Sequence, residues 1–481
     1  MKHEFPGLGS GLGSLLCLGL VLLDTTWALP TRNSAIRAST LSTNDTTIWA
    51  SALSANNTAA QTLALLTNDT IRDIDLPRNN TALRGAGKPK VPLSVRSRWI
   101  VDADGQRVKL RCINWAGHLE TNVPEGLHRQ PIEHMADWIV AQDFNCVRLT
   151  YATDMTQNPS LSVDESFRRG ARAAKVDEAA VMVLYHAAVQ KNPFLHNASV
   201  IDVFDRVQAT LWERGVMTIL DNHVSHSSWC CDLLDGNGWW KDAPFPVPWN
   251  SRYFDTQQWQ RGLGYMAGWS RSRPGIVGLS LRNELRAFIT QMISAPVTWL
   301  SHMPPAGRIV HDANPDALVI VGGINGGTDL TPLYWRNLNT TGWTHKRVWE
   351  AHSYSFTFTT PGVGICPLQR AAYGALYGFV LKQNEEHTGP LFLSEFGVGL
   401  SGGSHDGLSG KDRRYLKCLV KYMESNDADW ALWAIQGSYY IRAGKIDRNE
   451  TWGALDYEWK DWRNSKFKNM LGGMFYMTQG P

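Results

Sequence analysis

The sequence predicts an α/β fold, a (β/α)8 TIM barrel with a short N-terminal β-hairpin. From Arg98 onward, eight short apolar runs alternate with segments of helical periodicity. Parallel strands that are buried on both faces appear in a sequence as such continuous apolar runs, and the helices between them cover the sheet. Eight strand-helix units in about 380 residues are typical of this barrel with insertions. A doubly wound sheet is the alternative, but no Gly-x-Gly-x-x-Gly motif follows the first run.

The elements can be placed in order along the chain. Trp99–Val108 is predicted to form the hairpin, with its turn at Asp104-Gly105. Helices are expected between the strands, for example over Pro131–Gln142, which has proline at its first position, and over Ile201–Arg214, which Gly215 closes. The predicted barrel strands are Leu110–Ile113, Cys146–Leu149, Met217–Leu220, Val277–Leu281, Leu318–Val321, Val348–Ala351, Leu391–Leu393 and Trp430–Ala434.

The first 92 residues differ from the rest of the chain. The apolar run Leu12–Leu23 is shorter than the roughly 20 residues that span a bilayer. Residues 1–28 are therefore predicted to be a signal peptide, with an uncleaved anchor as the alternative. Residues 29–92 are rich in Ser, Thr and Asn and are interpreted as a disordered, glycosylated linker or stalk. Residues 93–481 are the predicted catalytic domain. N-glycosylation sequons begin at Asn44, Asn56, Asn68, Asn79, Asn197, Asn339 and Asn449.

Composition excludes some classes of protein. A chain that is 43% hydrophobic and 19% charged can bury a large core, which excludes a wholly disordered protein. A formal net charge of +3 over 481 residues indicates no nucleic-acid partner. The 21 Trp residues suit either the apolar faces of sugar rings or a large core. The predicted loops contain Trp115, Trp229, Trp239, Trp240 and Trp249, which either line a sugar cleft or pack against the surface.

Six of the seven cysteines lie outside the predicted signal peptide, and an even number in an exported protein indicates disulfide bonds. Cys230 and Cys231 are adjacent and are expected to bond to other partners rather than to each other. Cys112 and Cys146 lie on predicted core strands, where they form disulfides or remain buried thiols. The pairing of Cys366 and Cys418 is left open.

Polar and aromatic side chains gather where the predicted strands end, which is where this barrel carries its active site. Glu284 and Glu395 directly follow apolar runs, where a carboxylate is poorly solvated unless it has partners. The fourth and seventh strands lie across the barrel from each other, so the two carboxylates can flank one glycosidic bond. Ion pairs with nearby arginines are the alternative. The other residues at the strand ends are Arg148, His223, Asn283, His352, Tyr354 and Trp433.

From Arg98 to Tyr476 the chain resembles glycoside hydrolase family 5, a family of (β/α)8 retaining β-glycosidases. Asn283-Glu284 is similar to the family's acid/base motif, and Leu393-Ser-Glu-Phe-Gly397 to its nucleophile motif. Trp229-Cys-Cys231, Gly236-Asn-Gly238 and Gly437-Ser-Tyr-Tyr440 resemble a branch best known from plants. The segment from Asn114 to Glu120 is one residue longer than the pattern of many cellulases in the family, so no sugar-binding role is carried over to His118 or Glu120.

The resemblance implies roles for the site residues. Glu284 is expected to be the general acid and base, with a pKa raised by burial and by the charge of Glu395. Glu395 is the expected nucleophile, held by Arg148 and Tyr354, about 5–5.5 Å from the acid. The expected substrate-binding residues are Arg148, His223, Asn283, His352, Tyr354 and Trp433. No metal or cofactor is expected. Asp232, Asp235 and Asn237 either hold a structural Ca²⁺ or form a plain turn.

The predicted function is that of a secreted, retaining β-glycosidase, extracellular or in the cell wall, which acts on a β-glucan or related polysaccharide. The expected partner is the carbohydrate alone, with a monomeric chain and no membrane span after signal removal. Two alternatives are a glucosylceramide or sterol-glucoside β-glucosidase and a catalytically silent carbohydrate-binding protein.

Overall fold

A computed structural model describes residues 88–358, 365–401 and 406–481 of the chain. The predicted signal peptide and nearly all of the predicted stalk, with the four sequons at Asn44, Asn56, Asn68 and Asn79, lie outside the described residues. The other three sequon asparagines, Asn197, Asn339 and Asn449, are exposed. Within the described part of the chain, no helix is both long and apolar enough to cross a membrane.

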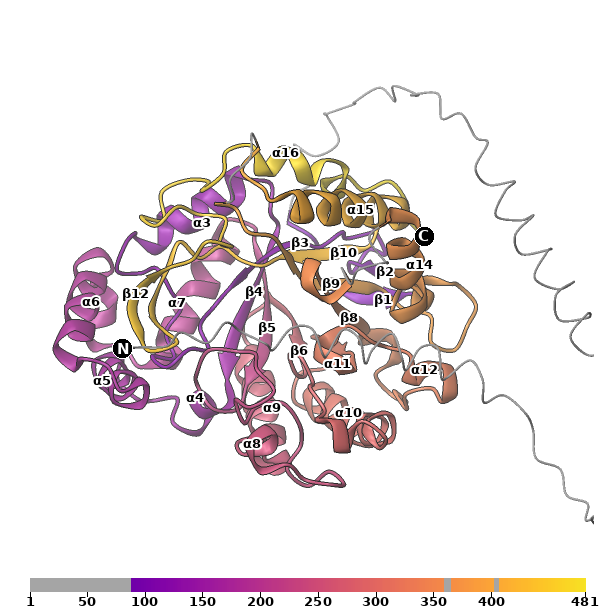
Figure 1. The fold of residues 1–481 in the computed structure, drawn as a ribbon, viewed down its shortest axis with the longest axis horizontal. Helices are drawn as coiled ribbons and strands as arrows, with labels where there is room; N and C mark the ends of the chain where they lie inside the picture. Colours follow the sequence, from indigo (N-terminus) through magenta and orange to yellow (C-terminus); the bar gives the residue numbers. More distant parts are fainter. Residues whose placement is uncertain (1–87, 359–364, 402–405) are drawn as a thin grey trace, which may run out of the picture. The chain divides into compact units, whose positions relative to one another are not determined.

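Eight parallel strands form a closed barrel, surrounded by helices (Figure 1). The strand order around the barrel is β10-β3-β4-β5-β6-β7-β8-β9, so chain neighbours pair and the last strand closes on the first. This confirms the predicted fold, and each predicted apolar run lies within or overlaps one strand. The strands are β3 (Arg111–Trp115), β4 (Cys146–Ala152), β5 (Met217–Val224), β6 (Ile276–Ser280), β7 (Leu318–Gly322), β8 (Arg347–Tyr354), β9 (Leu391–Gly397) and β10 (Asp429–Leu432).

The N-terminal hairpin is present, but its strands differ from the prediction. β1 (Ser94–Arg96) pairs with β2 (Trp99–Val101), so the turn of the hairpin precedes Trp99. The predicted pairing across Asp104-Gly105 is reduced to one bridge, between Val101 and Arg107. The reason is local, because the Asp102 carboxylate accepts hydrogen bonds from two backbone amides of this loop and closes it as a turn.

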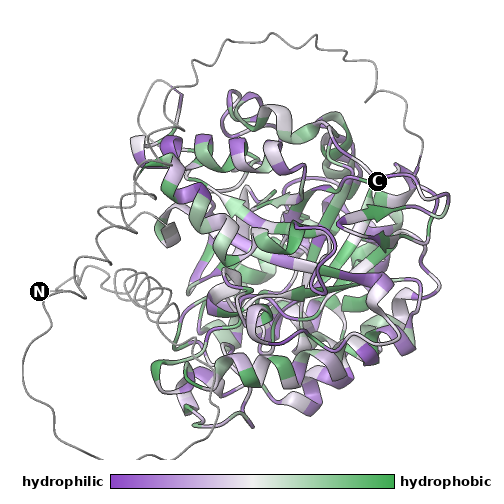
Figure 2. Ribbon diagram, turned by 90° about the vertical axis from the view of Figure 1, so that its right-hand side faces the viewer, coloured by the Kyte–Doolittle hydropathy of each residue, from purple (hydrophilic) through white to green (hydrophobic). Residues whose placement is uncertain are grey.

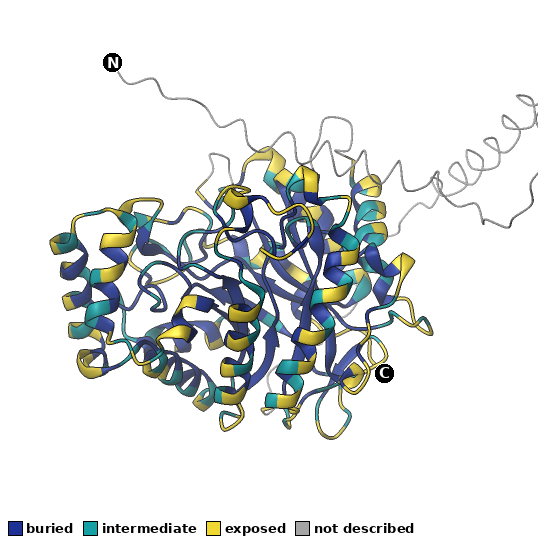
Figure 3. Cartoon of the chain, turned by 90° about the horizontal axis from the view of Figure 1, so that it is seen from below, coloured by how far each residue is buried: buried dark blue, intermediate teal, exposed yellow. Residues whose placement is uncertain are grey.

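The helices form the outer layer, buried on their inner faces and exposed on their outer faces (Figure 3). Helix α7 begins with a Ser199–Asp202 capping box, and Gly215 follows its end with a positive φ of 78°. Pro131 precedes α3 as its N-cap instead of being its first residue. The α-helices are α3 (Ile132–Ala141), α4 (Thr153–Gln157), α5 (Val163–Ala174), α6 (Glu178–Lys191), α7 (Val200–Glu213), α8 (Pro248–Ser251), α9 (Thr256–Ser270), α10 (Ala295–Ala313), α11 (Ile324–Gly327), α12 (Pro332–Trp335), α13 (Ser355–Phe358), α14 (Cys366–Leu376), α15 (Gly410–Asn426) and α16 (Phe467–Leu471).

Short elements complete the fold. A second hairpin, β11 (Ser438–Arg442) with β12 (Lys445–Asn449), follows the last barrel strand. The 3₁₀ turns are η1 (Pro193–Asn197), η2 (Ile289–Gln291), η3 (Thr344–Lys346), η4 (Gly378–Leu381) and η5 (Gly472–Phe475).

The barrel interior is apolar at one end. Side chains near the beginnings of the strands, such as Cys112, Met217 and Phe392, pack against Leu93 and Ile100 from the N-terminal hairpin region. This cluster closes the N-terminal end of the barrel, and a larger apolar layer lies between the strands and the helices. The hydrophobic strands at the centre of the molecule are visible in Figure 2. The polar side chains inside the barrel therefore lie toward the opposite end, where the strands finish.

Most of the tryptophans examined in the sequence belong to the core. Trp115, Trp239 and Trp240, which were predicted in loops, are fully buried. Trp240 packs 5.3 Å from Phe254 and 5.8 Å from Trp259 between ring centroids, among side chains that cover the barrel. Trp115 is the last residue of β3 instead of a loop residue, and the loop that contains Trp239 and Trp240 folds back onto the helix layer. None of the three tryptophans therefore lines a sugar cleft.

Three disulfides are present among the described residues. Cys112–Cys146 joins the register partners of β3 and β4, and Cys366–Cys418 joins α14 to α15. The third is Cys230–Cys231, so the expectation that these adjacent cysteines bond elsewhere was wrong. Among the described residues, the other four cysteines are paired with one another, so each of these two has only its neighbour as a partner there.

Candidate active site

Seven of the eight predicted site residues lie at or near the C-terminal ends of barrel strands, Arg148 lies nearer the middle of its strand, and all eight form one connected group. Arg148 lies on β4, His223 on β5, and Asn283 and Glu284 just after β6. The remaining residues lie on β8, on β9 and just after β10, and they are His352, Tyr354, Glu395 and Trp433. Each of these side chains contacts at least one other member of the group.

Glu395 is held on both carboxylate oxygens. Arg148 Nη1 donates to Oε1 at 2.8 Å, and the Tyr354 hydroxyl donates to Oε2 at 2.8 Å, as the resemblance implied. Burial raises the pKa of Glu395, and the nearby charges of His352 and Arg148 oppose the rise without cancelling it. Two donors of fixed position therefore orient this carboxylate in a buried setting.

Glu284 is less buried than expected, with 18% of its side chain exposed. Its Oε1 lies 3.2 Å from His352 Nδ1, and its Oε2 lies 3.8 Å from Arg286 Nη1. The backbone at Glu284 has a positive φ of 35°, which is uncommon for a residue with a side chain and is typical of functional sites. The segment is held on either side, because Asn283 N donates to the carbonyl of Asn222 and Arg286 N to that of Gly238.

His352 lies between the two glutamates. Its Nδ1 is 3.2 Å from Glu284 Oε1 and 3.7 Å from Glu395 Oε2. The nearest carboxylate oxygens of the two glutamates lie within 4.8 Å of each other. Burial alone would lower the pKa of His352, but the charges of Glu395 and Glu284 outweigh burial and raise it. The two carboxylates are therefore close enough to act on one bond.

Arg148 has two further acidic partners that the sequence analysis did not assign. Its Nη2 lies 2.8 Å from Asp221 Oδ1 and 3.1 Å from Glu350 Oε1, and all three side chains are buried. Burial alone would lower the pKa of Arg148, yet the charges of Asp221, Glu350 and Glu395 raise it above its ordinary value. The sequence did contain a signal for Glu350. Alternate residues of a strand point to the same face, and Glu350, His352 and Tyr354 are spaced two residues apart.

His223 is fixed by a carboxylate and by two aromatic rings. Its Nδ1 is 2.6 Å from Asp221 Oδ2, and its ring lies 3.9 Å from His118 and 5.4 Å from Trp433 between centroids. Burial, with the charge of Arg148, lowers the pKa of His223 well below its ordinary value, so the ring is neutral. A neutral ring that donates from Nδ1 to Asp221 presents the lone pair of Nε2 to the amide of Asn283, 3.4 Å away. His118, which was left without a role, is thus part of the site's support.

An aromatic group lies beside the carboxylates. Trp433, Tyr354 and Ala434 pack together, with Trp229 and Trp452 partly buried against them. Phe356 stacks on Tyr354 with ring centroids 5.1 Å apart and is 49% exposed. Of the loop tryptophans in the sequence analysis, Trp229 is therefore the one that lies next to the site.

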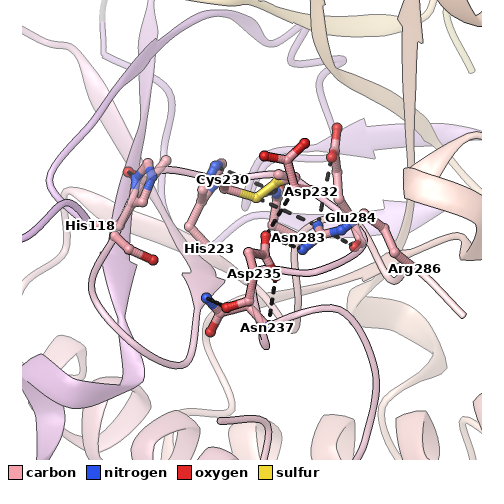
Figure 4. The surroundings of a disulfide bond; sticks show 12 residues. His118, His223, Cys230, Asp232, Asp235, Asn237, Asn283, Glu284 and Arg286 are labelled. Carbon is pink, nitrogen blue, oxygen red and sulfur yellow. Dashed lines mark hydrogen bonds and ion pairs between the residues drawn. A yellow bond between two sulfur atoms is a disulfide. The ribbon is translucent and has the colours of Figure 1, made fainter. Parts of the chain in front are cut away.

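The loop after β5 is held by its own side chains. Asp235 Oδ2 pairs with Arg286 Nη2 at 2.8 Å, and Asn237 Oδ1 accepts from the amides of Ser225 and His226. These oxygens are engaged by protein donors, which favours the plain turn over a Ca²⁺ site. Figure 4 shows this loop with the Cys230–Cys231 disulfide above it, beside Asn283 and Glu284.

The family model described as Cellulase (glycosyl hydrolase family 5) matches residues 101–438, which is more than half of the chain. The chain belongs to glycosyl hydrolase family 5. A family 5 protein from the plant Chamaecyparis obtusa is 38% identical over 409 residues, which cover 83% of this chain and 68% of that protein. An endoglucanase from Paenibacillus polymyxa is 23% identical over 394 residues, covering 78% of this chain and 84% of that protein.

Solved structures have the same fold. An endocellulase from Pyrococcus horikoshii, determined in a complex with cellotetraose, has a TM-score of 0.62 at 16% identity and covers 81% of this chain and 100% of its own. The catalytic domain of the major endoglucanase from Xanthomonas campestris has a TM-score of 0.60 at 21% identity, with coverage of 79% and 99%. Membership of family 5 makes the chain a glycoside hydrolase.

Proposed function

We propose that this family 5 glycoside hydrolase cleaves β-glucan chains with retention of configuration, with Glu395 as the nucleophile and Glu284 as the acid and base. The observation that carries the proposal is the approach of the two carboxylates, whose nearest oxygens lie within 4.8 Å with His352 between them. Inverting glycosidases separate the two groups by about 6.5–9.5 Å to admit a water molecule, so the closer spacing supports direct attack by one carboxylate.

In the first step, a Glu395 oxygen attacks the anomeric carbon while Glu284 donates its proton to the glycosidic oxygen. The bond from the anomeric carbon to that oxygen breaks, and the leaving sugar departs with the proton as a free hydroxyl. Arg148 and Tyr354 hold Glu395 in position for the attack through their 2.8 Å hydrogen bonds.

In the second step, water attacks the anomeric carbon of the ester. Glu284, now ionised, takes a proton from the water, and Glu395 leaves as a carboxylate. His352 lies 3.2 Å from Glu284 and 3.7 Å from Glu395, so a protonated ring stabilises whichever of the two is charged.

The remaining residues bind the sugar. Asn283 is placed to donate from Nδ2 to the C2 hydroxyl, since its Oδ1 already accepts from Arg148 Nη2 at 3.0 Å. The Trp433 ring, next to His223, offers a flat apolar face for a sugar ring. The endoglucanase relatives and the cellotetraose complex of the Pyrococcus horikoshii enzyme support a β-glucan as substrate.

The test is hydrolysis by the purified full chain. Reducing ends and glucose are measured on β-1,4-glucan, β-1,3-glucan, mannan and xylan, and proton NMR identifies the first anomer released. We expect activity on a β-glucan with the β-anomer formed first. Glu395→Gln should lower kcat at least about a thousandfold, because the nucleophile is lost.

Glu284→Ala provides a second check, because azide can replace the water that Glu284 activates. The variant should regain turnover on an activated aryl glycoside and release a β-glycosyl azide. An α-anomer as first product would overturn retention. Glycan binding by the wild-type protein without any turnover would instead favour the silent carbohydrate-binding alternative.

A lipid glucoside is the second candidate, because large apolar side chains are exposed beyond the strand ends. Ile289 is 55% exposed, Ile293 89% and Phe356 49%. Exposed apolar groups near a site are typical of a surface that meets a lipid. Glucosylceramide and a sterol glucoside in mixed micelles are therefore added to the substrate panel, and glucose release from either one alone would favour this candidate.

We also propose that the chain is an exported, monomeric glycoprotein. Three disulfides among the described residues and the exposed Asn197, Asn339 and Asn449 support a passage through the secretory pathway. Expression in a eukaryotic host should give protein in the medium that loses mass on enzymatic deglycosylation and elutes as a monomer. Retention of the unglycosylated chain inside the cell would contradict this.

A further inference from the structure

The Cys230–Cys231 disulfide lies directly against the residues that flank Glu284. Asn283 Nδ2 is 3.8 Å from Cys230 Sγ and 3.6 Å from Cys231 Sγ, and Arg286 Nη1 is 3.5 Å from Cys230 Sγ. Arg286 also donates to the backbone carbonyl of Glu284 at 2.8 Å. In Figure 4 the disulfide lies between His223 and the Asn283–Glu284 segment.

The partners of the Asn283 amide determine which of its atoms can bind a substrate. Arg148 occupies its oxygen, whereas its nitrogen faces the disulfide sulfurs and His223 Nε2. A disulfide sulfur is a weak hydrogen-bond acceptor, so it packs against the amide without competing strongly for its N–H groups. One N–H group of the amide meets His223 Nε2, and the other meets only the weakly accepting sulfurs, so this second N–H can be given up to a substrate hydroxyl.

The disulfide contributes little to global stability. Cys230 and Cys231 are adjacent, so their bond closes no loop of the unfolded chain, whereas the other two disulfides link residues 34 and 52 positions apart. Because a disulfide stabilises a fold mainly by restricting the unfolded chain, an adjacent pair has almost nothing to restrict. Its effect is local, on the side chains it touches.

We propose that the Cys230–Cys231 disulfide is a positioning element of the active site, which fixes the Asn283 amide against the C2 hydroxyl of the sugar. The inference rests on the proposed function, in which Asn283 binds that hydroxyl. Contacts with the C2 hydroxyl strengthen in the transition state of retaining glycosidases, so a displaced amide lowers kcat more than it raises KM.

Reduction of the disulfide is one way to displace the amide. A dithiol such as dithiothreitol supplies two electrons and two protons, the S–S bond becomes two thiols, and the reductant closes to its cyclic disulfide. The two sulfurs then move apart, and the Asn283 amide loses the disulfide against which it packs.

The test compares two chromogenic substrates, 2,4-dinitrophenyl β-cellobioside and its analogue without the C2 hydroxyl on the ring that bears the leaving group. The ratio of their kcat/KM values measures what the C2 hydroxyl contributes. In Cys230→Ala/Cys231→Ala this ratio should fall at least about tenfold from the wild-type value. The fall should come from a lower kcat on the substrate that has the C2 hydroxyl. Cys366→Ala/Cys418→Ala removes a disulfide between outer helices and should leave the ratio unchanged.

A double-mutant cycle identifies the residue through which the disulfide acts. Asn283→Ala should lower the ratio as well, and combining it with Cys230→Ala/Cys231→Ala should add almost nothing, because both changes remove one contact. Fully additive losses would overturn the inference. A wild-type ratio in the Cys230→Ala/Cys231→Ala protein would also overturn it, while leaving the proposed function intact.

Reduction of the unmutated enzyme checks the inference without a folding problem. Dithiothreitol should lower the ratio in the wild-type protein and in Cys366→Ala/Cys418→Ala, and it should leave Cys230→Ala/Cys231→Ala unaffected. An equal response of that variant to dithiothreitol would refute the assignment. If the wild-type protein hydrolysed neither 2,4-dinitrophenyl β-cellobioside nor any glycan, the proposed function would be overturned, and the inference with it.

Discussion

Replacing Glu120 with glutamine should stabilise the protein strongly at pH 8 and only slightly at pH 5. Glu120 lies in the loop after β3, where its Oε2 is buried without a hydrogen-bond partner among the described residues. Burial raises the pKa of this carboxyl from its ordinary 4.5 to about 7. A folded-state pKa above the unfolded one means that stability is lost as the pH rises from about 4.5 to about 7.

The magnitude follows from the two pKa values. Each pH unit between them is worth about 1.4 kcal/mol, so ionised Glu120 destabilises the fold by up to about 3 kcal/mol above pH 7. Glutamine has the shape of the protonated acid and cannot ionise, so Glu120→Gln removes this cost. For a domain of about 390 residues, the melting temperature at pH 8 should rise by about 4 °C.

Thermal unfolding, followed by circular dichroism at pH 5 and pH 8, measures the effect. Glu213→Gln is the matched control, because it makes the same chemical change at a side chain that is 68% exposed. A gain for Glu120→Gln that is the same at both pH values would refute the reasoning, since it would come from packing and not from ionisation.

Two further predictions concern the support of the barrel. Arg148→Met leaves the buried Asp221, Glu350 and Glu395 without their shared cation. Urea unfolding at pH 7 should show that the free energy of unfolding falls by about 3–5 kcal/mol. A fall of less than about 1 kcal/mol would argue against the importance of these ion pairs. Cys112→Ala/Cys146→Ala removes a link between residues 34 positions apart and should lower the free energy of unfolding by about 3–4 kcal/mol in the same assay. Cys230→Ala/Cys231→Ala should lower it by almost nothing, because that disulfide closes no loop of the unfolded chain. Equal losses in the two variants would contradict this reasoning.

The eight strands and the meeting of the eight candidate site residues could be predicted because their signals are local. A strand buried on both faces needs a continuous apolar run, and the residue that ends the run, such as Glu284 or Glu395, faces the active end of the barrel. The hairpin turn was predicted at Asp104-Gly105, whereas the observed turn precedes Trp99. The Asp102 side chain closes the Asp104-Gly105 loop with hydrogen bonds, and the alternation of apolar residues does not reveal such bonds.

Other features depend on distances that a sequence does not contain. The partner of each cysteine is set by which sulfurs the fold brings together, so the Cys230–Cys231 bond could not be deduced. The spacing of Glu350 from His352 and Tyr354 places it on the same face of the strand, but its partner Arg148, on a distant strand, is known only from the structure. Trp239 and Trp240 looked like loop residues because a loop that folds back onto the core has no periodicity of its own.

The contacts of Arg148 link the chemistry of the site to the completion of the fold. This one side chain on β4 contacts Asn114 on β3, Asp221 on β5, Asn283 after β6, Glu350 on β8 and Glu395 on β9. Five other barrel strands, or in the case of β6 the residues just after it, therefore supply a group to the same guanidinium. A partly assembled barrel, with the early strands formed and β8 and β9 still absent, lacks Glu350 and Glu395 and leaves Arg148 paired with Asp221. The first turnover after refolding thus reports the moment when the ring of strands is complete.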